Sequence, residues 1–158
     1  MADARFEDGE AGPLNLVARD GDDLQVISAL VQDAVLTGAD LKWERAKRRF
    51  ACLINRFRWE DRDAAEAARR PYERVRALLV IEDALAVRSQ GIDRGDPETV
   101  LSILSLDWAP GADGTGAVTL VLAGDGAVRL EVEALEVTLH DVTKPYIAPS
   151  RRKPEHRD

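Results

Sequence analysis

The sequence offers few side chains of the types that bind metals or act as nucleophiles. It holds one cysteine, Cys52, and two histidines, His140 and His156, which lie far apart in the chain. A structural zinc site needs about four ligands, mostly cysteine and histidine, and a nucleophile needs a general base beside it. Cys52 stands between apolar neighbours, as a core cysteine does. We therefore expect no metal site and no catalytic residue, and these patterns favour a non-enzymatic protein.

Two other patterns have both a chemical and a structural interpretation. Glu131 and Glu133 are spaced to share one face of a strand, where paired carboxylates can act as acid and base. Because that face is opposite the apolar residues, an exposed surface with ion pairs is the favoured interpretation. The glycines at 111, 114 and 116 do not match the Gly-x-Gly-x-x-Gly pattern and lie between strands. They predict a hairpin loop, so no cofactor is expected.

Basic and aromatic side chains alternate in the segment 42–59, which is the strongest sign of a binding surface. Residues 42–76 carry twelve basic and six acidic side chains, a net charge of +6, whereas residues 77–144 carry four basic and twelve acidic ones, a net charge of −8. A basic, aromatic hairpin can hold RNA or a phosphorylated ligand through charge and stacking. The candidate binding residues in this hairpin are Arg45, Lys47 and Arg49.

The same hairpin also has a structural interpretation. Its arginines could face the acidic second half of the same domain, or cover a strand edge and protect it from aggregation. The whole chain has 22 basic and 29 acidic side chains and a net charge of −7, which opposes binding to nucleic acid and to anionic membranes. Nucleic acid is therefore the less favoured partner, and no membrane partner is expected.

A second group of polar residues follows the ends of long apolar strands. It consists of Asn55 and Arg56, the segment 88–90 (Arg-Ser-Gln) and Asp93. The mouth of a barrel often holds a ligand, so four of these residues become candidates for ligand binding: Asn55, Arg56, Arg88 and Gln90. The alternative is that they bond to backbone groups of the loops.

The elements that position these side chains are mostly strands. One helix is predicted over residues 21–32, because Asp20 can accept hydrogen bonds from free amides of the first turn and apolar residues then recur at helical spacing. Beyond residue 32 the apolar period changes to two, which is typical of strands. Two strands joined by a turn at 45–48 are predicted, and a long strand over 72–90 should be interrupted at residues 82–83. A short helix or a loop is expected over 61–70.

The clearest hairpin lies in the C-terminal half. Apolar residues alternate on both sides of the sequence Gly124-Asp125-Gly126. Pairing Leu120 with Leu130 puts both apolar sets on one face, and Gly126 would then take the left-handed position of the turn. The apolar parity shifts near Ala134, which predicts a bulge or a sharp bend there.

Together these elements predict an α+β, mainly β fold: a strongly bent antiparallel sheet, or a partly closed barrel, of six or seven strands with an N-terminal helix at its open end. The length of 158 residues and the apolar content of 45% suit one domain. We expect that domain over residues 14–143, between flexible tails at 1–13 and 144–158. A lone cysteine and a charged start of the chain predict a cytoplasmic protein.

Four segments have a distinctive sequence: 30–35 (LVQDAV), 49–60 (RFACLINRFRWE), 87–94 (VRSQGIDR) and 127–133 (AVRLEVE). In these segments, and over about residues 14–142, the chain resembles the alphaproteobacterial family known as domain of unknown function 2948. The resemblance implies a single bacterial domain. It brings no activity, ligand or residue role with it.

The expected function is therefore that of a non-enzymatic interaction or scaffold module. Such a module would act through a surface of the bent sheet, on another protein or on a second copy of the chain. The alternative is a module that binds a small ligand or RNA through the hairpin 42–59 or through the polar residues at the strand ends.

Overall fold

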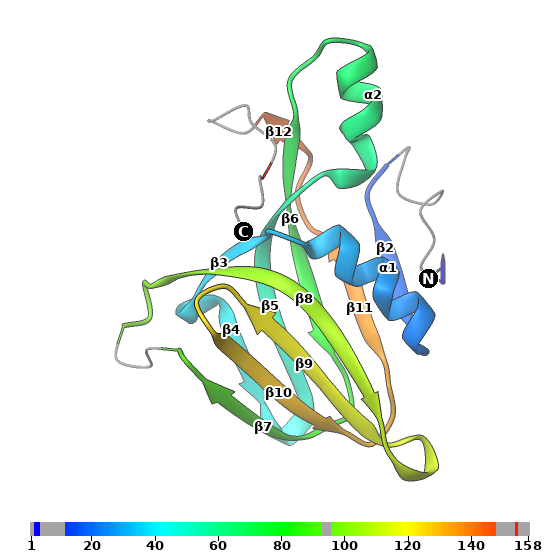
Figure 1. Cartoon of the computed structure of the whole chain (residues 1–158), viewed down its shortest axis with the longest axis vertical. Coiled ribbons are helices and arrows are strands. Elements are labelled where there is room, and N and C mark those ends of the chain that lie inside the picture. The colour runs from blue at the N-terminus through cyan, green and yellow to red at the C-terminus, as the bar shows by residue number, and fades with distance from the viewer. Residues whose placement is uncertain (1, 4–11, 93–95, 148–153, 155–158) are drawn as a thin grey trace.

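The computed structural model describes residues 2–3, 12–92, 96–147 and 154 (Figure 1). These residues form one sheet of twelve strands and two short helices, so the predicted class, a mainly β protein with a bent antiparallel sheet, is confirmed. The helices are α1 (Gly21–Val31) and α2 (Arg62–Ala67). The strands are β1 (Ala2–Asp3), β2 (Asn15–Ala18), β3 (Val35–Thr37), β4 (Leu41–Glu44), β5 (Arg49–Phe57), β6 (Glu73–Ile81), β7 (Ala84–Gln90), β8 (Val100–Pro110), β9 (Gly116–Leu122), β10 (Gly126–Val132), β11 (Val137–Asp141) and β12 (Tyr146–Ile147).

The sheet has more strands than the six or seven predicted. Three of them, β1, β2 and β12, have only two to four residues, which is too short for alternation to stand out in a sequence. The strand predicted before the turn at 45–48 is divided into two short strands, β3 and β4. The long strand predicted over 72–90 is also divided, into β6 and β7. The chain bends between them at Asp83, whose φ is 57°, so the interruption predicted at residues 82–83 is confirmed.

The strands follow one path across the sheet, in the order β1-β2-β11-β6-β5-β3-β8-β9-β10-β7. β4 pairs with β5 beside this path, and β12 pairs with β6. Every pairing is antiparallel except that of β1 with β2. Within the described residues, β4 pairs only with β5 and β7 only with β10, and both edges lie on the same side of the molecule (Figure 1). The sheet therefore bends into a barrel that stays open along a seam between β4 and β7.

Helix α1 covers the interior of the bent sheet (Figure 1). Asp20 caps it as predicted, because the Asp23 N–H donates to Asp20 Oδ1 at 2.8 Å. The Leu106 N–H donates to the Ser28 hydroxyl oxygen at 2.9 Å, which attaches the helix to β8. Its buried side chains are Leu24, Ile27, Leu30 and Val31. In the part of the chain that the structure describes, no helix has the length and apolar character needed to cross a membrane.

The β9–β10 hairpin has the predicted face but a different register. Leu120 lies opposite Val128, so the predicted pairing of Leu120 with Leu130 is wrong by two residues. A shift of two residues keeps every side chain on its face, and Leu120 and Leu130 are both fully buried. The turn decides the register: its loop is 123–125, and the positive φ angles fall on the last two residues of that loop and not on Gly126.

The backbone after β7 leaves no room for a side chain at Gly91. Its φ is +67°, and a Cβ there would lie 2.8 Å from the carbonyl oxygen of Asp125. Gly124, in the β9–β10 loop, has a similar φ of +77° but no atom within 4 Å of such a Cβ. The two glycines therefore share the same backbone strain, and only Gly91 adds a steric clash.

We expect Gly124→Ala to lower the free energy of unfolding by about 1–2 kcal/mol, the cost of a left-handed residue with a side chain. Gly91→Ala should cost about 1–3 kcal/mol more, because the added methyl group overpacks the contact with the loop. Urea unfolding followed by circular dichroism measures both. Equal losses in the two variants would show that the loop with Asp125 moves aside for the added methyl group at no cost in free energy.

Candidate functional site

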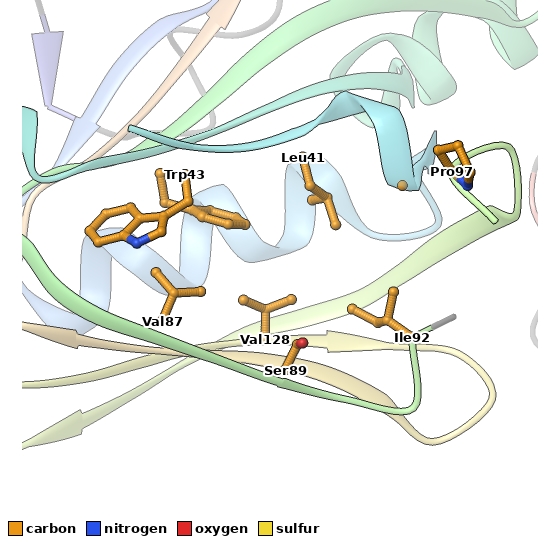
Figure 2. Close-up of a pocket in the computed structure, with 9 residues that line it drawn as sticks. Leu41, Trp43, Val87, Ser89, Ile92, Pro97 and Val128 are labelled. Carbon is orange, nitrogen blue, oxygen red and sulfur yellow. The ribbon is translucent and has the colours of Figure 1, made fainter. Parts of the chain in front are cut away.

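A slot runs along the seam between β4 and β7 (Figure 2). It encloses about 400 Å³, which lies within the range of about 300–1,000 Å³ for small-molecule sites. Side chains reach it from both edges of the open barrel and from the strands behind them. Its lining includes Leu41, Trp43, Phe50, Val87, Ser89, Ile92 and Val128.

Strand alternation places these side chains in the slot. Trp43 lies directly opposite Phe50 in the β4–β5 pair, and Ser89 lies opposite Val128 in the β7–β10 pair. Because successive side chains of a strand point to opposite faces, Val87 and Ser89 face inward while the residue between them, Arg88, faces outward. Two paired rows of inward residues thus meet across the seam.

Among the described residues, one backbone hydrogen bond closes the seam at each end. At one end the Ala84 N–H donates to the carbonyl oxygen of Arg48 at 2.9 Å, and at the other the Ala39 N–H donates to that of Pro97 at 2.9 Å. Between these two bonds no ladder joins β4 to β7 within the described residues. The slot is therefore the unpaired middle part of the seam. The hydrogen bonds at the two ends of the seam fix the distance between its edges.

The lining of the slot is apolar and carries no ionisable side chain among the described residues. Its polar side-chain groups are the hydroxyl of Ser89 and the ring N–H of Trp43. Such a lining suits an uncharged, mainly apolar molecule, because a charged group would lose its hydration without gaining a partner. The described part of the lining provides no acid or base that could move a proton. The described residues also contain no cluster of three or more histidine, cysteine or carboxylate side chains arranged to hold a metal.

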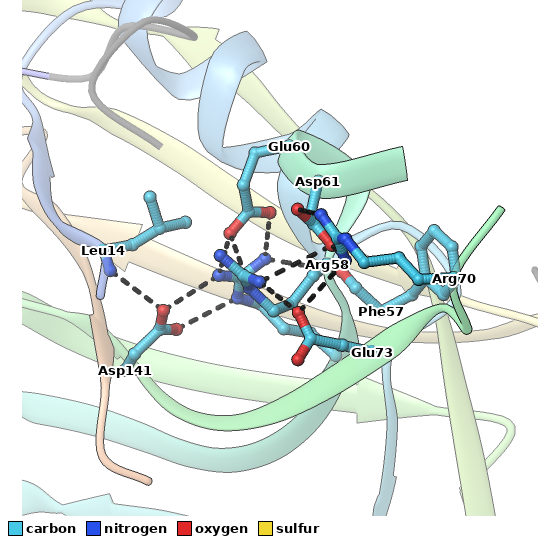
Figure 3. A network of polar contacts seen from close by, with 9 residues as sticks. Leu14, Phe57, Arg58, Glu60, Asp61, Arg70, Glu73 and Asp141 are labelled. Atoms are coloured by element: carbon cyan, nitrogen blue, oxygen red, sulfur yellow. Dashed lines mark hydrogen bonds and ion pairs between the residues drawn. The ribbon is translucent and has the colours of Figure 1, made fainter. Parts of the chain in front are cut away.

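Arg56, a predicted ligand-binding residue, lies elsewhere, in a buried ion-pair network with Glu60 and Asp141. Figure 3 labels these two carboxylates. The Arg56 side chain is fully buried and forms two hydrogen bonds with Glu60, at 2.8 and 2.7 Å, and two with Asp141, at 3.1 and 2.9 Å. Asp141 also accepts a hydrogen bond from the Leu14 N–H at 2.9 Å. Burial alone would lower the pKa of Arg56, but the hydrogen bonds to both carboxylates raise it above its usual value. Arg56 joins β5 to β11 and to the start of β2.

A neighbouring set of ion pairs attaches α2 to the sheet (Figure 3). Arg70 donates two hydrogen bonds of 2.6 Å to Asp61, and Arg58 donates one of 2.6 Å to Glu73. The hydrogen bonds from Arg70 lower the pKa of Asp61, against the opposing effect of its burial, and the charge of Arg58 lowers it further. The guanidinium groups of Arg58 and Arg70 therefore stabilise the fold.

The candidate residues of the hairpin 42–59 lie at its exposed tip. Lys47 pairs with Glu44 at 3.5 Å and Arg49 with Glu82 at 2.7 Å, while Arg45 is exposed and has no ion pair with any described residue. Arg48, beside them, reaches Glu133 of the acidic half at 3.1 Å. Arg48 and Arg49 thus pair with carboxylates of the acidic second half, whereas Lys47 pairs within its own hairpin.

The aromatic residues of that hairpin are not on the surface beside the arginines. Trp43 lines the slot, Phe57 is fully buried, and Trp59 donates its ring N–H to the carbonyl oxygen of Gln32 at 2.9 Å. Trp43 and Phe57 are thus separated from the basic groups of the exposed tip, whereas Trp59, which follows β5, has the guanidinium of Arg62 at 6.0 Å from its ring centre.

The polar residues at the strand ends do not converge on one pocket. Asn55 hydrogen-bonds to the Tyr146 hydroxyl and accepts a hydrogen bond from Arg74 at 2.7 Å. Arg88 and Gln90 are exposed on the outer side of β7, and Asp93 lies outside the described residues. Of that group, Ser89 reaches the slot. The apolar residues of the slot have the same alternation as core residues, so no sequence signal distinguishes them.

The buried network predicts a large effect of removing one partner. Asp141→Ala should lower the free energy of unfolding by about 3–5 kcal/mol, because it leaves the buried guanidinium of Arg56 with one carboxylate fewer. Arg48→Ala is the control: its ion pair with Glu133 is exposed and should be worth about 0–1 kcal/mol. Chemical denaturation of both variants measures the contrast, and similar losses would show that the network contributes no more than a surface pair.

The network also predicts a dependence on acid. The folded-state pKa of Asp61 lies below the ordinary value of 3.8, so the charged carboxylate stabilises the fold above that pH. The stabilisation is lost as the pH falls through the lower, folded-state value. The difference in unfolding free energy between the wild type and Asp61→Asn should therefore be larger at about pH 6 than at about pH 2.5. A difference that stays constant between the two pH values would contradict this.

Comparison with known proteins identifies a family, and the function of that family is unknown. A family model described as "Protein of unknown function (DUF2948)" matches residues 14–156, in agreement with the resemblance seen in four segments of the sequence. No curated protein and no solved structure matches the chain. Since the match covers most of its length, the chain belongs to the DUF2948 family of proteins of unknown function.

Proposed function

We propose that the protein is a non-enzymatic binding module whose slot between β4 and β7 holds a small, uncharged, mainly apolar ligand. The observation that carries the proposal is the lining of this slot of about 400 Å³: its side chains are mainly aromatic and aliphatic, and none of those that the structure describes is ionisable. Of the roles expected from the sequence, this is the small-ligand alternative. Its site, however, is the seam and not the hairpin tip or the strand-end polar residues.

The slot suits a ligand better than it suits chemistry. Catalysis of proton transfer needs an acid or base within hydrogen-bond reach of the reacting atoms, and the described lining supplies neither. Binding needs only apolar burial and a few polar contacts to orient the ligand. Trp43 offers a flat apolar surface on one side of the slot, and Val87 and Val128 offer aliphatic ones on the other (Figure 2). Phe50, which lies opposite Trp43 in the β4–β5 pair, adds a second aromatic ring to the lining.

RNA binding by the hairpin has less support. Its candidate residues Lys47 and Arg49 are already paired with carboxylates of the same domain. Base stacking, which contributes about 1–3 kcal/mol per base in single-strand binding, would require exposed aromatic rings next to the basic groups. The aromatic side chains of the hairpin are instead directed into the protein.

A pair of matched dyes tests the proposal. N-phenyl-1-naphthylamine is uncharged and fluoresces more strongly in apolar surroundings, and 8-anilinonaphthalene-1-sulfonate has the same rings with a sulfonate added. At about −0.3 kcal/mol per heavy atom, the uncharged dye should bind with a Kd of about 0.2 mM or tighter. The sulfonated dye should bind at least about tenfold more weakly, because the described residues of the lining include no cation to pair with it.

Two tryptophan variants show where the dye binds. Val87→Trp should fill the slot and weaken binding of the uncharged dye at least about tenfold, or 1.4 kcal/mol. Leu104→Trp places the same side chain on an exposed position of β8, outside the slot, and should leave the affinity unchanged. Absence of binding to the wild type, or equal affinity in both variants, would refute the proposed site.

A further inference from the structure

The slot contains a side-chain hydrogen bond donor that has no acceptor among the described residues. Trp59 donates its ring N–H to the carbonyl oxygen of Gln32 at 2.9 Å. Within the part of the chain that the structure describes, Trp43 and Trp108 donate theirs to no acceptor. Of these two, Trp43 lines the slot and Trp108 does not. Ser89, the other side chain of the described lining with a polar group, already has a partner in the chain.

The ring N–H of Trp43 is directed into the slot. Figure 2 shows the ring nitrogen on the edge of the indole that faces Val87 across the seam. Trp43 is partly buried against the core, so a molecule in the slot would cover this N–H and separate it from water. Leaving a covered donor without an acceptor is unfavourable. A ligand that supplies an acceptor at this place is therefore favoured over a ligand of the same shape that does not.

The two ends of the slot differ in polarity. Trp43 and Val87 lie together at one end, and Leu41, Ile92 and Pro97 lie toward the other (Figure 2). The side chains of these last three residues are apolar and offer no hydrogen bond donor. A bound molecule would therefore place its polar group beside Trp43 and its apolar body toward Ile92.

We propose that the ligand of the slot carries a carbonyl oxygen at one end, and that Trp43 selects this ligand by donating its ring N–H to that oxygen. The inference rests on the proposed function, in which the slot holds an uncharged, mainly apolar molecule. A ketone or ester carbonyl is uncharged and accepts a hydrogen bond without bringing a donor of its own. A hydroxyl group would bring an O–H that needs a further acceptor. The ligand class is thus an apolar ketone or ester.

Two uncharged dyes of equal size test this hydrogen bond. The dye 6-propionyl-2-dimethylaminonaphthalene has a carbonyl group. N-phenyl-1-naphthylamine has the same naphthalene ring and the same number of non-hydrogen atoms but no carbonyl. Trp43→Phe removes the ring N–H and keeps an aromatic side chain in the lining. The ratio of the two Kd values, measured by fluorescence titration in each protein, cancels any effect that the substitution has on both dyes alike.

Loss of the ring N–H should weaken binding of the carbonyl dye relative to the other dye. In Trp43→Phe the ratio of the Kd values should change at least about fivefold, the effect of one hydrogen bond. The carbonyl dye emits at longer wavelength when its oxygen accepts a hydrogen bond, so its bound emission should move to shorter wavelength in this variant. Trp108→Phe is the matched control outside the slot, and it should change neither the ratio nor the emission.

The outcomes separate this inference from the proposed function. If both dyes bind the wild type and lose affinity in Val87→Trp, but the ratio is the same in Trp43→Phe, the proposed function stands and the selection by Trp43 is overturned. An equal change of the ratio in Trp108→Phe would overturn it as well. So would a carbonyl dye that emits, when bound to the wild type, at the wavelength it has in a hydrocarbon solvent. If neither dye binds the wild type, both proposals fail.

Discussion

The architecture depends on one apolar interior that both halves of a single bent sheet share. β5, β6 and β11 supply one wall and β8, β9 and β10 the other, and their inward residues belong to a single buried cluster with those of α1. Burial of apolar surface stabilises the fold by about 25 cal/mol per Å². This gain in free energy favours a sheet that bends around its buried apolar side chains. The slot lies where the interior reaches the seam, between edges that do not pair.

The bend at Asp83 allows one chain to supply both walls. β6 pairs with β5 and β11, whereas β7, only two residues further along the chain, pairs with β10. A straight continuation of β6 would keep the chain on its first wall. By turning there, the chain brings β7 back toward β4 and so creates the seam. The slot, its closing hydrogen bonds and the exposed edges are consequences of this single change of direction.

Buried charged side chains and the apolar slot lie in different parts of the molecule. Arg56 is buried, at a high cost in lost hydration, and two carboxylates with four hydrogen bonds compensate for it. The slot, by contrast, has no ionisable group in its described lining. The molecule thus uses its buried charges to hold strands and α2 together and leaves an apolar surface open at the seam. The basic segment 42–76 balances acidic groups of its own domain, as in the pairs of Arg48 with Glu133 and Arg49 with Glu82.

The sequence by itself determined the features that depend on neighbours in the chain: the cap at Asp20, the helix after it, the interruption at residues 82–83 and the apolar face of the β9–β10 hairpin. Each is set by local hydrogen bonding or by the period of the side chains. Only the tertiary structure decided the hairpin register, the short strands, the seam and the partners of Arg56. A period of two is unchanged by a shift of two residues, an apolar residue beside a slot has the same pattern as one in the core, and Asp141 lies 85 residues from Arg56 in the chain.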